Sequence, residues 1–159
     1  MLQQYKNILV PIDGSFEAEL AFKKAVEVAK RNKAAVHLLH VIDTRAFQNV
    51  SSFDSTMVEQ ITEKAKETVK GYVKTAKEAG LTEIDYSIEY GAPKAIIAND
   101  FPKKLGIDLV MIGATGLNAM ERLLIGSVTE YVTRTAACDV LVVRTDLDNN
   151  PIKDVKKKK

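Results

Sequence analysis

The sequence predicts an α/β protein built on a doubly wound parallel sheet. Five segments with the apolar character of buried strands alternate with four segments that carry apolar residues at helical spacing. Parallel strands need a crossover between them, and a helix supplies it while covering one face of the sheet. With 159 residues, 46% of them hydrophobic, we expect a single domain over residues 1–144. Residues 145–159 lack an apolar period, which predicts a disordered, lysine-rich C-terminal tail.

The first half of the chain uses the strand and helix unit twice. Residues 7–12 form a short apolar run, and residues 18–29 then place apolar side chains at helical spacing between Glu and Lys. The apolar run of residues 34–42 predicts a second strand. Apolar residues between positions 57 and 76 mark a long second helix, which Gly80 ends.

The second half continues this alternation. Residues 84–90 alternate between apolar or aromatic and polar side chains, which predicts a strand with one wet face. Pro93 suits the first turn of the helix that follows, and residues 107–112 predict a nearly continuous buried strand. Residues 127–137 predict a last helix and residues 139–144 a last strand.

Charge and composition argue against several classes of protein. The five cations and three anions of residues 146–159 account for the net charge of +2, and a neutral body argues against a nucleic-acid partner. The sequence has neither a secretion signal nor eighteen consecutive apolar residues, so we expect no membrane partner and a cytoplasmic location. The single cysteine, Cys138, cannot form an intrachain disulfide, and we expect it to be inert.

Two segments follow strands at the edge where open α/β sheets bind ligands. Asp13-Gly14-Ser15 follows the first strand, and a G-x2-G-x9-G-S pattern of Gly113, Gly116, Gly126 and Ser127 follows the fourth. Glycines let the backbone approach an anion, and a helix that opens at a serine offers amides and a hydroxyl to phosphate. We therefore favour a phosphate site. The alternative is that the glycines only turn the chain while Ser127 caps the last helix.

Asp13 suits the ribose of a nucleotide, because a carboxylate accepts hydrogen bonds from two ribose hydroxyls. The alternative is a turn that caps the following helix, and the two roles are compatible. The motifs of dinucleotide-binding, P-loop, esterase and zinc proteins are absent from the sequence. His37 and His40 lie in the second predicted strand without residues that would complete a site, so we expect both to be structural.

From about residue 5 to residue 144, the chain resembles the universal stress protein family. The resemblance lies in residues 8–15, in His40-Val41, in the glycine pattern and in residues 140–144. It implies an adenine nucleotide alpha hydrolase-like fold with five strands in the order 3-2-1-4-5, so that the first and fourth strands are neighbours. It also implies a homodimer through the last strand, whose residues Val140 to Val143 would otherwise form an exposed apolar edge.

The resemblance further implies a site for ATP, or another adenine nucleotide, together with Mg²⁺ or Mn²⁺. By the family pattern, Pro11 and Asp13 flank the nucleoside and Val41 lines the adenine slot. Five residues wrap the phosphates: Gly113, Gly116, Gly126, Ser127 and Val128. The chain departs from the pattern at Ala114-Thr115, where many members have a serine and a basic residue. Arg122 either substitutes for that basic residue or is a solvated arginine paired with Glu121.

Three functions are consistent with these residues. We favour an ATP-binding protein of stress response or signalling with little or no hydrolysis, because the sequence offers no evident carboxylate for that chemistry beyond Asp13. A slow ATPase or phosphotransfer enzyme is one alternative, and a nucleotide-free dimeric interaction protein is the other. Residues 43–54, a polar segment after the second strand, are a candidate lid.

Overall fold

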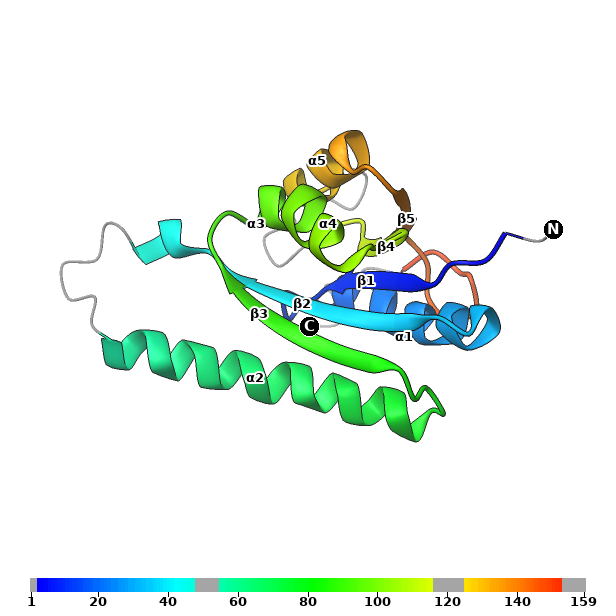
Figure 1. Cartoon of the computed structure of the whole chain (residues 1–159), viewed down its shortest axis with the longest axis horizontal. Coiled ribbons are helices and arrows are strands. Elements are labelled where there is room, and N and C mark those ends of the chain that lie inside the picture. The colour runs from blue at the N-terminus through cyan, green and yellow to red at the C-terminus, as the bar shows by residue number, and fades with distance from the viewer. Residues whose placement is uncertain (1–2, 48–54, 116–124, 153–159) are drawn as a thin grey trace, which may run out of the picture.

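The computed structural model describes residues 3–47, 55–115 and 125–152, which form a five-stranded sheet with the order β3-β2-β1-β4-β5 (Figure 1). The strands are β1 (Asn7–Pro11), β2 (Ala35–Ile42), β3 (Ile84–Tyr90), β4 (Leu109–Gly113) and β5 (Asp139–Val143). Every pairing between them is parallel. The predicted fold class and strand order are therefore confirmed.

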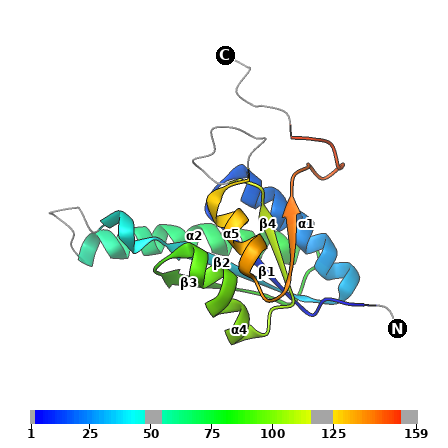
Figure 2. The same cartoon turned by 90° about the horizontal axis from the view of Figure 1, so that it is seen from above.

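Helices connect the strands and cover both faces of the sheet (Figure 1). The helical segments are α1 (Phe16–Asn32), the 3-10 turn η1 (Thr44–Phe47), α2 (Ser55–Glu78), α3 (Pro93–Ala95), the π-helix η2 (Ile96–Asp100), α4 (Phe101–Leu105) and α5 (Ser127–Thr135). The first turns of α2 extend with η1 beyond the strands (Figure 2). Within the described ranges, no helix has the length and apolar character needed to cross a lipid bilayer.

Two hydrophobic cores lie on opposite faces of the sheet. Ile8 and Val10 of β1 belong to the core under α1 and α2, whereas Leu9 belongs to the core under η2, α4 and α5. Strand β4 divides in the same way, with Met111 on the first side and Val110 on the second. Both faces of these central strands are buried, which explains why their sequences are continuous apolar runs.

Local hydrogen bonds determine where α1 begins and ends. The Oγ of Ser15 accepts the Ala18 amide at 3.1 Å and caps the first turn. At the other end, Lys33 adopts a left-handed conformation with φ of 55° and donates its amide to the Ala29 carbonyl. The start of α1 is thereby fixed directly after the loop that leaves β1.

The helix predicted from Pro93 is interrupted by the π-helical segment η2. Pro102 has no amide hydrogen, and its ring would clash with the carbonyl four residues before it. Within η2 the hydrogen bonds widen, so that the Phe101 amide donates to the carbonyl of Ile96. Gly106, with φ of 62°, then ends α4 in the left-handed conformation.

Residues 145–152 form a closed turn, which differs from the disorder that the sequence predicts from residue 145. Thr145 and Pro151 form an antiparallel bridge. The Nζ of Lys24 in α1 donates to Thr145 Oγ1 at 2.6 Å and to Asn149 Oδ1 at 3.1 Å, and Ile152 packs against the core of α1 and α2. Because this turn is held mainly by polar hydrogen bonds, its residues do not show a regular spacing of apolar side chains in the sequence. Residues 153–159 lie outside the described residues.

Candidate functional site

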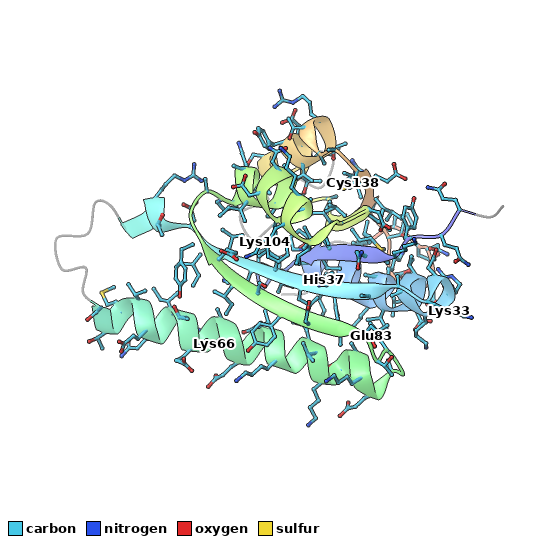
Figure 3. The ribbon with its side chains drawn as sticks, in the orientation of Figure 1. Lys33, His37, Lys66, Glu83, Lys104 and Cys138 are labelled. Carbon is cyan, nitrogen blue, oxygen red and sulfur yellow. The ribbon has the colours of Figure 1, made fainter. Side chains whose placement is uncertain are left out.

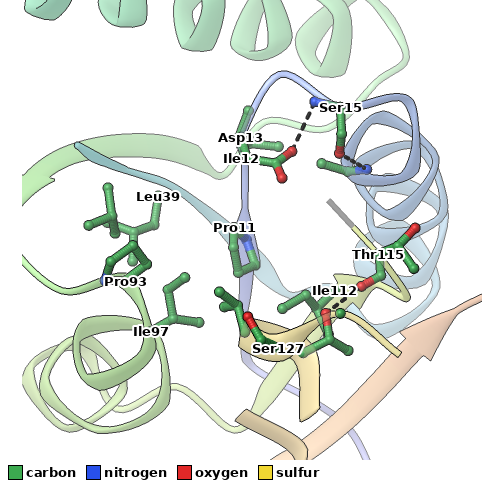
Figure 4. A pocket seen from close by; sticks show the side chains of 16 residues that line it. Pro11, Ile12, Asp13, Ser15, Leu39, Pro93, Ile97, Ile112, Thr115 and Ser127 are labelled. Atoms are coloured by element: carbon green, nitrogen blue, oxygen red, sulfur yellow. Dashed lines mark hydrogen bonds between the residues drawn. The ribbon is translucent and has the colours of Figure 1, made fainter. Parts of the chain in front are cut away.

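A cavity of about 390 Å³ opens at the carboxyl ends of β1, β2 and β4 (Figure 4). From β1 the chain adds β2 and β3 in one direction along the sheet. It then crosses over β1 and adds β4 and β5 in the other direction. The cavity therefore lies at the point where the strand order reverses, as is usual for ligand sites in open α/β sheets.

The structure brings together seven of the eight residues predicted for the site. The seven that line the cavity are Pro11, Asp13, Val41, Gly113, Gly126, Ser127 and Val128. Gly116 lies outside the described residues, as do Arg122 and residues 48–54 of the candidate lid. Every predicted site residue that the structure describes therefore lines this cavity.

The loop between β1 and α1 is held by a short network of hydrogen bonds. Asp13 Oδ1 accepts the Ser15 amide at 2.9 Å, and Ser15 in turn caps α1. The carbonyl of Ile12 lies 2.7 Å from Nδ1 of His40, so this nitrogen carries a proton and donates it. Asp13 nevertheless remains exposed, so its carboxylate is accessible to a ligand. Asp-Gly-Ser is thus a turn and a cap, with Ser15 as the capping residue.

Gly113 and the start of α5 form the opposite wall of the cavity. A Cβ at Gly113 would lie 2.9 Å from the backbone carbon of Glu17, so the glycine allows α1 to pass close to the end of β4. The hydroxyl of Thr129 donates to the Gly113 carbonyl at 2.7 Å, and the Gly126 amide donates to the Ala114 carbonyl at 2.8 Å. These bonds fix the first turn of α5 against β4.

Helix α5 begins at the cavity without a side-chain cap. Gly126 is its N-cap residue, with φ of −61° and ψ of 155°, and Ser127 is its first helical residue. The alternative in which Ser127 caps the helix is therefore wrong. The first amide to bond within this helix is that of Glu130, to the Gly126 carbonyl at 2.9 Å. The amides of residues 127–129 lack intrahelical partners, as at any helix start, and these residues line the cavity.

The cavity has an apolar side and a polar side. Leu39, Pro93 and Ile97 group on one side and Thr115 lies on the other, with Pro11 between them (Figure 4). The polar side holds the hydroxyls of Thr115 and Ser127 as well as the start of α5. Neither Lys nor Arg is present in the described part of the lining. This arrangement suits a ligand with a flat apolar group at one end and an anionic group at the other.

Several lining residues were not predicted from the sequence. Pro93 and Ile97 follow β3, and the rule that drew attention to the residues after the first and fourth strands would have found Pro93 if it had been applied to the third. Leu39 and Thr129 carry no distinguishing signal. Thr115 appeared only as a departure from a family pattern, yet it is a buried residue of the cavity wall.

The histidines and the cysteine lie outside this cavity. His37, which Figure 3 labels on β2, hydrogen-bonds to Asp85 of β3. His40 hydrogen-bonds to the Ile12 carbonyl, so both histidines have the structural roles expected for them. Burial, followed by the charges of Asp139 and Asp108, raises the pKa of the Cys138 thiol, which therefore remains protonated and unreactive near neutral pH. In the described ranges no three His, Cys, Asp or Glu side chains are grouped to hold a metal ion.

Comparisons with known proteins agree with this fold. The sequence profile of the universal stress protein family matches residues 4–144. A Staphylococcus haemolyticus protein assigned to that family is 48% identical over 142 residues, which cover 89% of this chain and 86% of that protein. The solved structure of universal stress protein UspA from Lactobacillus plantarum is 32% identical, covers 90% of this chain and 100% of that chain, and has a TM-score of 0.75.

Two further solved structures of the same fold contain an adenine nucleotide. A universal stress protein in complex with cAMP is 23% identical, with a TM-score of 0.68, over 89% of this chain and 98% of that chain. One from Archaeoglobus fulgidus in complex with dAMP is 24% identical, with a TM-score of 0.62, over 88% of this chain and 98% of that chain. At these identities the likeness is one of fold.

Proposed function

Since this chain belongs to the universal stress protein family, we propose that it is an ATP-binding member that acts in stress response or signalling. The observation that carries the proposal is the start of α5, where residues whose amides have no side-chain cap line a cavity whose other end is apolar. A helix N-terminus favours an anion, and an apolar slot favours a flat base. A nucleotide combines both groups.

The strand order suggests how the nucleotide would lie. Strand β1 is between β2 and β4, and Asp13 at its end is the one carboxylate in the described lining. In our proposal Asp13 accepts the ribose hydroxyls, the base lies toward Val41 and the phosphates lie toward Gly126 and Ser127. Base, ribose and phosphates then follow the order β2, β1, β4 across the sheet.

A divalent cation, Mg²⁺ or Mn²⁺, would accompany the phosphates. The described lining offers no cationic side chain, so the metal would supply the positive charge that a polyphosphate requires. The hydroxyls of Thr115 and Ser127 are hard oxygen donors, which fit such a cation alongside phosphate oxygens and water. These residues would orient the phosphate chain.

We propose binding rather than turnover. Hydrolysis needs a group that positions or deprotonates the attacking water, and our proposal already assigns Asp13 to the ribose. The cAMP and dAMP complexes of related proteins support the nucleotide assignment only at the level of the fold. The argument for this chain comes from its own cavity.

Calorimetric titration of the nucleotide-stripped chain with ATP and Mg²⁺ tests the proposal. Ser127→Pro removes one amide at the first helical position, where proline is tolerated, and Gly126 already has the extended conformation that precedes proline. We expect this variant to bind ATP about tenfold more weakly, the scale of one lost hydrogen bond to a charged group. Adenosine should bind the variant and the wild type equally.

Ser127→Ala is the matched control, since it removes the hydroxyl and keeps the amide. We expect a smaller loss of ATP affinity than in Ser127→Pro. If both variants bind ATP as the wild type does, the phosphates do not lie at α5. If the stripped wild type is folded by circular dichroism and does not bind ATP, the nucleotide proposal fails and a nucleotide-free dimeric protein becomes the better account.

A further inference from the structure

Glu89 lies beside the apolar end of the cavity, although it is not part of the lining. The parallel register of β2 and β3 pairs Glu89 with Val41, and Val41 lines the cavity. Neighbouring strands are about 4.8 Å apart, and directly paired residues point to the same face of a sheet. The Glu89 side chain is therefore one strand further out than the proposed base site.

Contacts along β3 confirm which face Glu89 shares. His37 and Asp85, which are paired in the same register, form a side-chain hydrogen bond, and Glu89 follows Asp85 by four residues. Residues an even number apart in a strand share a face. Tyr90 points to the opposite face, where its hydroxyl lies 2.6 Å from that of Thr62 in α2. The Glu89 side chain is thus on the face of the sheet where the cavity lies, and not on the face that α2 covers.

Glu89 is half-buried as a residue, and its carboxylate has no donor within the described ranges. Among the described residues, no hydrogen bond or ion pair involves its side chain, whereas other carboxylates of the same sheet, such as Asp85 and Asp139, have partners. Its oxygens are therefore available to accept a hydrogen bond from a molecule other than the protein. A ligand that carries an N–H group at this edge would supply the missing donor.

We propose that Glu89 determines the base specificity of the site by accepting a hydrogen bond from the exocyclic amino group of adenine. This inference rests on the proposed function. With the ribose over β1 and the base over β2, the 6-position of a purine, which is remote from the ribose, points toward β3. An amino group there donates to the carboxylate, whereas the 6-oxo group of guanine or hypoxanthine presents an acceptor to an acceptor.

The negative charge of Glu89 is compatible with a polyphosphate in the same cavity. Glu89 is in β3 and the proposed phosphate site follows β4, so three strand spacings, about 14 Å, separate them. The Debye length at physiological ionic strength is about 8 Å, which weakens repulsion over that distance. The carboxylate therefore acts on the base end of the ligand.

The test compares ATP with inosine triphosphate, which carries an oxygen in place of the 6-amino group, by calorimetric titration of the full chain. We expect the wild type to prefer ATP by about tenfold or more. Glu89→Gln should lose most of this preference, because an amide both donates and accepts. Glu89→Ala should lose it as well, because it has no acceptor. The matched control is Glu83→Gln, which makes the same change at an exposed position at the opposite end of β3.

Each outcome bears on one of the two proposals. The role of Glu89 is overturned if Glu89→Gln and Glu89→Ala both keep the preference for ATP over inosine triphosphate. Both variants must have unfolding temperatures close to that of the wild type. Equal binding of the two nucleotides by the wild type overturns it too, and leaves nucleotide binding itself intact. A folded wild type that binds neither nucleotide removes the proposed function, and with it this inference.

Discussion

Gly113 ends β4 at a point where the backbone of α1 passes close to the strand. The sequence predicted this glycine as part of a phosphate cradle. In the structure its missing side chain makes room for the backbone of Glu17, which a Cβ would approach to 2.9 Å. The glycine therefore has a packing role in addition to the role that we propose for it in the cavity.

Gly113→Ala should destabilise the protein by about 1–3 kcal/mol, because a backbone segment of α1 has to move to accommodate the methyl group. Gly71→Ala is the matched control. Gly71 is exposed within α2 and an added Cβ would meet nothing within 4 Å, so alanine there should stabilise the helix by about 0.5–1 kcal/mol. Urea unfolding of the two variants measures both effects. A Gly113→Ala variant as stable as the wild type would contradict the packing role.

At this scale the sequence predicted which residues meet in the site better than it predicted what each contacts. Position directly after a strand was sufficient for Asp13, and the spacing of the glycine pattern was sufficient for Gly126. In the first loop Ser15 caps α1, whereas Asp13 accepts the Ser15 amide. Which residue takes which role depends on side-chain geometry. The burial of Thr115 depends on how α5 returns across β4, which no local pattern records.

The contact between α1 and α2 joins two elements on one face of the sheet. The rings of Phe22 and Tyr72 meet edge to face, with centroids 4.7 Å apart and planes at 71°. Burial raises the pKa of the Tyr72 phenol above its usual value of 10.0, and the charges of Glu19 and Asp13 add to the effect. The folded protein therefore favours the neutral phenol.

This shift predicts a dependence of stability on alkaline pH. Because the pKa of Tyr72 is higher in the folded than in the unfolded chain, its contribution is fully present below about pH 10 and is lost as pH rises through the folded value. Tyr72→Phe should therefore show a shallower fall in unfolding temperature between about pH 9 and 11. The slopes are measured by thermal unfolding followed by circular dichroism. Parallel slopes for variant and wild type would exclude Tyr72 as a source of the effect.

Apolar periodicity predicted the strands and long helices to within a few residues, because each buries a continuous run or a stripe of side chains. It did not predict η2, since the widened hydrogen bonds before Pro102 change the backbone and leave the pattern of side chains nearly intact. It also failed for residues 145–152, where Lys24 provides a long-range polar contact. Such contacts depend on the folded arrangement of α1.

The sheet as a whole has two edge strands, β3 and β5. In β5, Leu141 is 40% exposed, whereas Val140 and Val142 pack toward the core under α5. An unpaired apolar edge is a template for association, and a copy of the same strand satisfies it by a twofold contact. We propose that the protein is a homodimer through residues 140–143.

Leu141→Lys should convert the dimer to a monomer, because it places a lysine from each copy at the edge that has to pair. Tyr90→Lys makes the corresponding change on β3, where Tyr90 is 47% exposed, and should leave the dimer intact. Analytical ultracentrifugation distinguishes the two states. Dissociation by Tyr90→Lys alone would move the interface to the other edge, and a monomeric wild type would remove it.

The central position of β1 has a consequence for folding. The cavity walls come from β2 on one side and from β4 and α5 on the other, and only the insertion of β1 between them brings the walls together. A chain with either half of the sheet unpaired has no complete cavity. By mass action, any molecule that occupies it stabilises only the fully assembled sheet, by RT ln(1 + [L]/Kd). Ligand concentration thereby sets the population of intact molecules, and partly unfolded forms are depleted as occupancy rises.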